Sequence, residues 1–209
     1  RKSGEPYLVH PLEVAKILTQ LKMDNASIVA AILHDTIEDT SVTKKDIEKE
    51  FGFDVAEIVD GVTKISQLQW ASHEERQAEN YRKMILAMSK DIRVILVKLS
   101  DRLNNMRTLQ FMSESQQIRI SQETLDIFAP IAGRMGIYWI KEELENLALK
   151  FLKPDVTKQI EARIQKLSKN RESYVQNVIT TLKDHLKESV PSVEISGRVK
   201  KPYSIFNKI

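Results

Sequence analysis

Four ionisable side chains lie within six residues, at 34–39 (HDTIED), directly after the apolar run at 28–33 (IVAAIL). On a helix, residues three and four apart share a face, so Glu38 lies one turn after His34. A helix that buries the apolar run, Ile32 included, carries these polar groups toward the interior or into a cleft. Because buried carboxylates without partners are costly, the fold must supply a compensating group. A divalent cation is the first candidate.

Two imidazoles and two carboxylates in apolar or tightly patterned settings are the candidate ligands: His10, His34, Asp35 and Asp101. The chain has no cysteine, so a metal must be held by nitrogen and oxygen atoms. Such a set suits Mn, Fe or Zn. A bound divalent ion lowers the pKa of a coordinated water, which favours hydrolytic chemistry near neutral pH.

Glu38 and Asp39 lie one turn beyond the candidate ligands. From there they could act as general base or acid on an attacking water, or orient it. The alternative is a solvated end of the helix, with Thr40-Ser41 as the exit. A single histidine beside an apolar helix is often a hydrogen-bonded core residue, so His10 alone does not establish a metal site.

The composition is that of a globular protein, with 209 residues, 42% of them hydrophobic and 29% charged. Lysine and arginine are interspersed with acidic residues, and the formal charge is only +3, so we expect no direct DNA binding. An anionic small substrate is compatible with this charge, and Lys98 and Arg102 are suited to phosphate oxygens. No apolar run reaches the roughly 20 residues of a membrane span.

Six glycines and six prolines in 209 residues favour long helices. In the first half, the apolar spacing predicts helices from residue 10 to 21, from 25 into the 34–39 motif, from 43 to 52 and from 54 to 62. We expect a loop over 61–72 and a helix over 74–89.

The second half continues the helical pattern. A central helix is predicted over 91–109, because its apolar positions are too many for a surface helix. Helices are also predicted over 113–134 and 137–152, with a break at Gly133–Gly136, and over 154–189. Residues 193–196 alternate like a strand after a boundary at Val190-Pro191.

Several segments resemble, in the same order, the hydrolase domain of RelA/SpoT-type (p)ppGpp synthetase/hydrolases. They are RKSGEPY at 1–7, VHP at 9–11, HDTIED at 34–39, DGVTK at 60–64, DRLNNMRTL at 101–109 and IFAPIA at 127–132. The four candidate ligands also resemble the ligand set of HD-domain metal-dependent phosphohydrolases. The resemblance implies an all-α fold, an HD-domain helical bundle. It also implies a cytoplasmic bacterial enzyme of the stringent response that uses Mn²⁺ to remove the 3′-pyrophosphate of (p)ppGpp.

The resemblance assigns roles residue by residue. His10, His34, Asp35 and Asp101 match the metal ligands. Glu38 and Asp39 match the acidic pair that activates the attacking water. The substrate-contacting positions are matched by Arg1, Lys2 and Ser3, which line the guanosine side of the pocket, and by Asn105 and Thr108. Two positions, Asn104 and Gly133, depart from the histidine of many relatives.

The tail at 197–208 resembles the opening of the family's synthetase domain, which is an α/β domain. The chain also begins without Met, so we expect a fragment of a longer, bifunctional protein. The expected division is a hydrolase domain over 1–152, a helical coupling region over 153–190 and the truncated start of a synthetase domain over 191–209. The parent protein is expected to contact ribosomes through regions outside this chain.

Two other functions stay open. One is a related HD phosphohydrolase acting on another nucleotide, such as NADPH, and the other is a nucleotide-binding regulatory module without turnover. The substrate expected from the resemblance is a guanosine polyphosphate, and the expected cofactor is Mn²⁺, with other divalent metals as alternatives.

Overall fold

The computed structural model describes residues 4–66, 90–168, 171–187, 189–190, 192–197 and 200–208. These residues form helices and connecting turns without any strand, so the all-α prediction is confirmed. The chain divides into two compact units, Arg1–Ala148 and Leu149–Ile209. The predicted three-part division into domains stays a prediction. Among the described residues, no helix combines the length and apolar character needed to cross a membrane.

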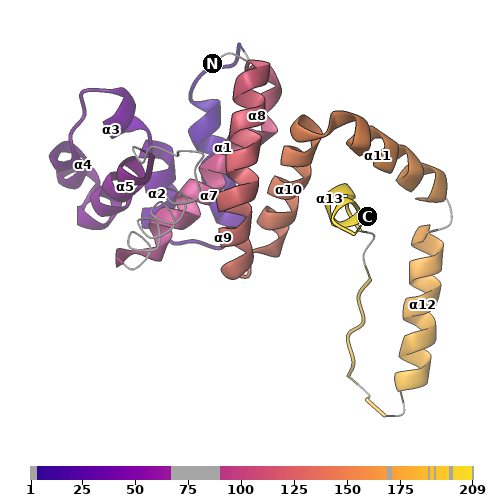
Figure 1. Cartoon of the computed structure of the whole chain (residues 1–209). Coiled ribbons are helices and arrows are strands. Elements are labelled where there is room, and N and C mark those ends of the chain that lie inside the picture. Colours follow the sequence, from indigo (N-terminus) through magenta and orange to yellow (C-terminus); the bar gives the residue numbers. More distant parts are fainter. Residues whose placement is uncertain are drawn as a thin grey trace. The chain divides into compact units, whose positions relative to one another are not determined.

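Unit 1 contains most of the helices (Figure 1). They are α1 (Val9–Gln20), α2 (Asn25–Leu33), α3 (Thr36–Asp39), α4 (Lys44–Phe51), α5 (Phe53–Ser66), α7 (Ile92–Arg107), the short 3₁₀ turn η1 (Leu109–Phe111), α8 (Glu114–Glu123), the π-helical turn η2 (Thr124–Phe128), α9 (Ala129–Arg134) and α10 (Tyr138–Leu152), whose last turn passes into unit 2.

Helix α7 is the central helix of unit 1, as predicted. It packs against α1, α2 and α5, and eleven of its sixteen residues are buried. The apolar part of its surface joins one core with residues of α1, α2, α4 and α5. Its polar positions Lys98, Asp101 and Asn104 are buried as well. Burying polar groups is costly unless they are paired, so these three side chains must have partners inside the domain. Packing of the helices alone does not require them.

Side chains cap the starts of three helices in unit 1. The Asp24 side chain accepts from the Ser27 backbone N–H at the start of α2, and Asp91 accepts from the Arg93 N–H at the start of α7. Thr43 and Asp46 form a reciprocal capping box at α4. These contacts confirm the predicted starts near residues 25, 43 and 91.

Helix α5 continues to Ser66, so the loop predicted from residue 61 is wrong over 61–66. Val62 and Ile65 are each 1% exposed, and their burial holds the added turn of helix. Gly61 lies in the contact between α5 and α7, where an added Cβ would stand 2.7 Å from Val94 Cγ2. The loop was predicted because the apolar pattern weakens after residue 61, but Gly61 permits close helix packing at this point. The predicted helix over 74–89 lies outside the described residues.

The predicted break at Gly133–Gly136 is confirmed between α9 and α10. Gly136 has φ +75°, and its N–H donates to Gly133 O, while the Ile137 N–H donates to Ala132 O. This paired arrangement ends a helix with a left-handed residue, a position that glycine fills without steric cost.

Unit 2 contains α11 (Pro154–Ser168), α12 (Arg171–Leu186) and α13 (Pro202–Phe206). The single helix predicted over 154–189 is therefore two helices. The strand predicted over 193–196 is also wrong, because these residues have no regular secondary structure. A strand needs a paired neighbour, and the described residues of unit 2 supply none. Gly197 instead packs its backbone close to the Val175 and Ile179 side chains of α12.

Candidate metal and catalytic site

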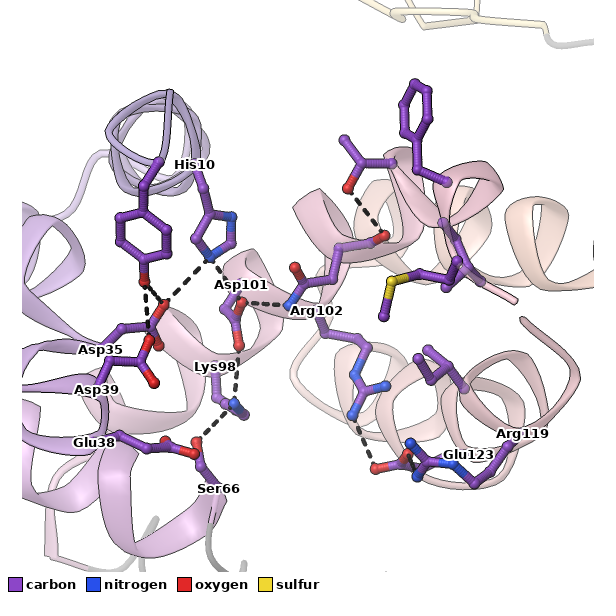
Figure 2. Close-up of a pocket in the computed structure, with 17 residues that line it drawn as sticks. His10, Asp35, Glu38, Asp39, Ser66, Lys98, Asp101, Arg102, Arg119 and Glu123 are labelled. Carbon is purple, nitrogen blue, oxygen red and sulfur yellow. Dashed lines mark hydrogen bonds and ion pairs between the residues drawn. The ribbon is translucent and has the colours of Figure 1, made fainter. Parts of the chain in front are cut away.

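A pocket of about 540 Å³ opens beside α7 in unit 1 and contains most of the predicted site residues. Figure 2 shows Asp35, Glu38 and Asp39 along one wall and Arg102 with Glu123 at the opposite end. Asp101 of α7 lies between the two ends. The pocket therefore has one strongly acidic end and one end with mixed charge and apolar side chains.

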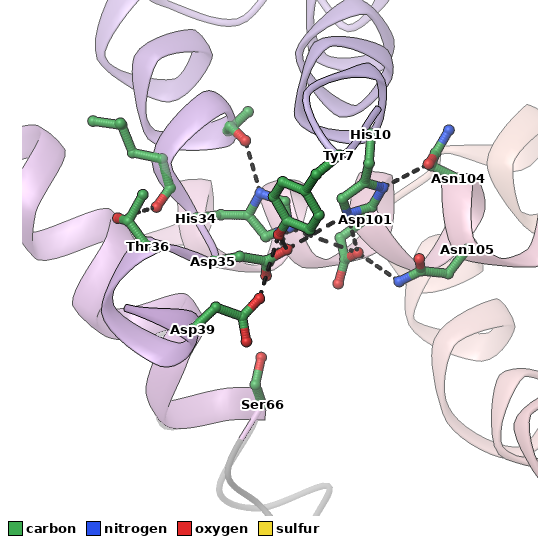
Figure 3. Close-up of polar contacts among 12 residues, drawn as sticks. Tyr7, His10, His34, Asp35, Thr36, Asp39, Ser66, Asp101, Asn104 and Asn105 are labelled. Carbon is green, nitrogen blue, oxygen red and sulfur yellow. Dashed lines mark hydrogen bonds and ion pairs between the residues drawn. The ribbon is translucent and has the colours of Figure 1, made fainter. Parts of the chain in front are cut away.

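Three helices bring three of the predicted ligands together. His10 lies in the first turn of α1, His34 ends α2, and Asp101 lies in the middle of α7. One potential ligand atom from each residue lies within 4.8 Å of the others (Figure 3). All three side chains are buried, with exposed fractions of 2%, 1% and 4%. Residues separated by up to 91 positions thus converge in the core.

Asp35, the fourth predicted ligand, lies beside this cluster and is partly exposed. Its Oδ1 lies 3.1 Å from His34 Nε2, and its Oδ2 lies 3.7 Å from His10 Nε2. The chain turns at His34 and Asp35, and the separate short helix α3 begins directly after them. The prediction of one helix through the motif is therefore wrong. Ile32, expected to be buried, is 37% exposed, whereas Ala31 is fully buried.

Each imidazole has a second contact that orients the ring. His34 Nδ1 donates to the backbone oxygen of Ala31 at 2.7 Å, and His10 Nδ1 donates to Asn104 Oδ1 at 2.6 Å. Both acceptors hold the proton on Nδ1, so both Nε2 atoms face the carboxylates with their lone pairs available. Contacts of this kind fix the orientation and tautomer of metal-binding histidines.

The Asp101 carboxylate is also held from outside the cluster. Asn105 Nδ2 donates to its Oδ1 at 2.6 Å, and Lys98 Nζ donates to its Oδ2 at 2.8 Å. Lys98 donates at 2.8 Å to Ser66 Oγ as well. Burial raises the pKa of Asp101, but Lys98 and the two histidines outweigh it and hold that pKa well below its usual range. Lys98, predicted for phosphate oxygens, thus pairs with a predicted metal ligand.

The donor set fits a divalent cation. His34 Nε2 is buried without a hydrogen-bond partner, although it faces Asp35 and Asp101. Burial lowers the pKa of His34, yet these carboxylates raise it by more, so the surroundings favour a positive charge at this point. A buried nitrogen lone pair and two carboxylates around one space suit a metal that accepts nitrogen and oxygen ligands.

The predicted acidic pair lies on α3 at the rim of the pocket. Glu38 and Asp39 are both exposed, and both line the pocket. Tyr7 connects this rim to the cluster, since its hydroxyl donates to Asp35 Oδ2 and lies 3.4 Å from Asp39 Oδ2. Burial is the largest cause that raises the pKa of Tyr7, with added contributions from both aspartates, so the phenol stays protonated.

The opposite end of the pocket places Arg102 against α8 and η2. Its Nη2 donates to Glu123 Oε1 at 2.8 Å, and its guanidinium lies 4.1 Å above the Phe128 ring. The predicted nucleotide contacts Asn105 and Thr108 also line the pocket, and Asn105 contacts Asp101 of the cluster. The other predicted contacts, Arg1, Lys2 and Ser3, lie outside the described residues.

Tyr7 and Asn104 are the contacts that sequence reasoning did not assign. Asn104 gave a spacing signal, because it lies three residues after Asp101 in the same helix, whereas Tyr7 lies before α1 begins and gave none. Residues three apart share a helix face, so Asn104 was placed on the ligand side of its helix. Its partner His10 lies 94 positions away, and no local pattern identifies it.

A helical domain with imidazoles and carboxylates converging beside an acidic rim has the arrangement of a metal-dependent hydrolase. The model of a family described as "HD domain" matches residues 1–138, and the chain belongs to this family. The crystal structure of lmo0812 from Listeria monocytogenes EGD-e is 27% identical. It covers 72% of this chain and 99% of that chain, with a TM-score of 0.54.

Longer curated relatives match the whole chain. A protein named GTP pyrophosphokinase from Myxococcus xanthus is 56% identical over 212 residues. A guanosine-3′,5′-bis(diphosphate) 3′-pyrophosphohydrolase from Vibrio cholerae is 45% identical over 209 residues. This chain spans 28% and 30% of their respective lengths. The predicted resemblance to the RelA/SpoT group is confirmed.

Proposed function

We propose that this chain is a hydrolase domain that removes the 3′-pyrophosphate of (p)ppGpp, giving GDP or GTP and pyrophosphate. The observation that carries the proposal is one pocket that joins a candidate cation-binding cluster, an acidic rim and a mixed, partly cationic end. The names of relatives that match the whole of this chain, which include pyrophosphohydrolases, support the substrate.

The proposed cofactor is Mn²⁺, held by His10, His34, Asp35 and Asp101. When bound, a divalent ion lowers the pKa of water and offsets charge on phosphate oxygens. The two histidines offer Nε2 because Asn104 and Ala31 occupy their Nδ1 atoms. Mn²⁺ agrees with a mixed set of imidazole and carboxylate donors, and Fe and Zn are the alternatives.

Glu38 and Asp39 are proposed to transfer protons during hydrolysis, as general base and general acid. Water adds to the phosphorus nearest the ribose, the bond from this phosphorus to the ribose 3′ oxygen breaks, and pyrophosphate leaves. One carboxylate takes a proton from the water and the pair returns one proton to the leaving 3′ oxygen, so that the protons balance. Exposure at the rim lets both carboxylates exchange protons with solvent, which the buried Asp101 cannot do as readily.

The rest of the pocket is proposed to hold the nucleotide. Asn105 and Thr108 line the same pocket as the cluster, so they can contact a ligand whose 3′-phosphates reach the cluster. Arg1, Lys2 and Ser3 are proposed to line the guanosine side. A pocket of about 540 Å³ is within the usual range for small-molecule sites.

Incubation of the chain with ppGpp and Mn²⁺ tests the proposal, with pyrophosphate release as the measurement. Release that depends on added Mn²⁺ is the expected result, and no release from protein with Mn²⁺ bound contradicts it. NADPH in a parallel reaction tests the alternative substrate. Binding of ppGpp without turnover would instead support the regulatory module.

The assignments that go beyond the hydrolase reaction are also proposals. The domain division at 152 and 190, the synthetase of a parent protein, the stringent response and the cytoplasmic location follow from the resemblance. The expected absence of direct DNA binding and the ribosome association of a parent protein stay predictions.

A further inference from the structure

The two imidazoles of the cluster are oriented by different kinds of acceptor. His34 donates to a backbone oxygen, that of Ala31, within its own helical turn. His10 donates to a side chain from another helix, Asn104 of α7. The contact of His34 forms whenever this end of α2 is helical, because its acceptor is a backbone oxygen. The contact of His10 forms only if the side chain at position 104 of α7 offers an acceptor. The ring of His10 is therefore the less securely positioned of the two.

We propose that Asn104 is a positioning residue of the metal site, which holds the His10 ring so that Nε2 points at the shared space. Asn104 is 5% exposed, and its Oδ1 lies 2.6 Å from His10 Nδ1. An amide oxygen only accepts hydrogen bonds, so it keeps the Nδ1 proton in place. The opposite nitrogen, Nε2, then lies 3.3 Å from Asp101 Oδ1 with its lone pair available.

The position on α7 gives this contact a second consequence. Asn104 lies one turn after Asp101, so one helix supplies a ligand and also orients a ligand on α1. A displacement of α1 relative to α7 would thus change the direction of His10 and its distance to Asp101 together. The inference rests on the proposed metal site but not on the identity of the substrate.

Asn104→Leu and Asn104→Asp form a matched pair, because both side chains resemble asparagine in shape and only aspartate keeps an oxygen acceptor. Mn²⁺ alone is titrated into each variant by calorimetry. Asn104→Leu is expected to weaken Mn²⁺ binding about 10- to 100-fold, the usual range for lost outer contacts of a metal ligand. Asn104→Asp is expected to stay within about threefold of the unsubstituted chain or to bind more tightly.

Nitrogen-edited NMR of the protein with Zn²⁺, a diamagnetic ion, reports on the rings directly. The unsubstituted chain should show hydrogen-bonded Nδ1–H signals for both His10 and His34. In Asn104→Leu the His10 signal should shift or exchange rapidly, while the His34 signal, held by a backbone acceptor, stays unchanged. A merely structural role for Asn104 would not change one ring selectively.

Asn146→Leu on α10 is the control, because the Asn146 amide donates to Glu142 O of its own helix and Asn146 does not line the pocket. Asn104→Ala is the second variant if leucine prevents folding, with the same loss expected. Unchanged Mn²⁺ affinity and an unchanged His10 signal in a folded variant lacking the acceptor would overturn the inference. So would an Asn104→Asp variant as weak as Asn104→Leu. If the unsubstituted chain binds Mn²⁺ but releases no pyrophosphate, the proposed function fails while the role of Asn104 is still decided.

Discussion

The ligand cluster and the acidic rim occupy the same pocket but differ in how firmly the protein holds them. His10, His34 and Asp101 are buried, come from three helices, and each has a contact outside the cluster. Glu38 and Asp39 are exposed and lie on a four-residue helix. The difference agrees with their proposed roles. Ligands must keep fixed positions, whereas residues that exchange protons must remain accessible to water and substrate.

The largest effect is expected inside the cluster. Asp101→Asn removes the carboxylate charge and leaves the buried Lys98 without its anionic partner. Mn²⁺ affinity should fall by more than about 100-fold, since loss of an outer contact alone costs 10- to 100-fold. Calorimetric titration with Mn²⁺ measures the change, and Asp54→Asn, at an exposed position at the start of α5, is the matched control. Near-normal affinity in Asp101→Asn would remove Asp101 from the ligand set.

A substitution at the rim should separate catalysis from metal binding. Glu38→Gln keeps the size of the side chain but cannot accept a proton, so turnover of ppGpp should fall about 10²- to 10⁴-fold. Mn²⁺ affinity should stay within about threefold, because Glu38 lies outside the cluster. Steady-state pyrophosphate release and Mn²⁺ titration measure the two properties. Loss of the metal in this variant would contradict the distinction between rim and cluster.

How much of the site could be predicted depends on whether its residues lie in one local motif or meet only through the packing of helices. His34, Asp35, Glu38 and Asp39 lie in one dense local motif, so their residue types and spacing made them candidates. The roles predicted for His10 and Asp101 depend on the family resemblance. The helix containing Asp101 was predicted as central, and its contact with α1 and α2 follows from its apolar pattern. Neither the contact of Asn104 with His10 nor that of Tyr7 with Asp35 is local, and both depend on how helices meet.

The fold errors have related physical causes. The loop predicted from residue 61 follows a weakening apolar pattern, but packing of Gly61 against Val94 and burial of Val62 and Ile65 continue the helix to Ser66. The strand predicted over 193–196 depends on a pairing partner that the described part of unit 2 does not contain. Periodicity identifies which residues can form an element, whereas neighbours decide whether they do.

Tyr7 connects the two regions, so its substitution tests whether they are independent. Tyr7→Phe removes the hydroxyl that donates to Asp35 Oδ2 and approaches Asp39. Mn²⁺ affinity should fall about 10-fold, at the low end for an outer contact, because Tyr7 is 50% exposed. Tyr138→Phe, at an exposed position on α10, should change neither Mn²⁺ affinity nor turnover. A drop in turnover without any change in Mn²⁺ affinity would place Tyr7 with the rim alone.

The smallest effect on function is expected at the start of α7, far along the helix from Asp101. The Asp91 side chain caps α7 and also accepts from the Arg93 guanidinium at 2.7 Å. Asp91→Ala should lower the free energy of unfolding by about 1 kcal/mol, while Asp91→Asn keeps the cap and should cost less. Mn²⁺ affinity should be unchanged in both, which would show that effects at Asp101 do not come from general loss of helix stability.

The same residue makes a prediction about pH. Burial raises the pKa of Asp91, but the contacts with Arg93 outweigh it and leave that pKa below its usual value. The folded state therefore binds this proton more weakly than the unfolded state, whose pKa is about 3.9. The stabilisation is present above that pH and is lost as the pH falls through the lower folded value. Thermal unfolding between about pH 6 and pH 3 should show a shallower decline for Asp91→Asn than for the unsubstituted chain. Equal slopes would mean that Arg93 does not stabilise the ionised carboxylate at this end of α7.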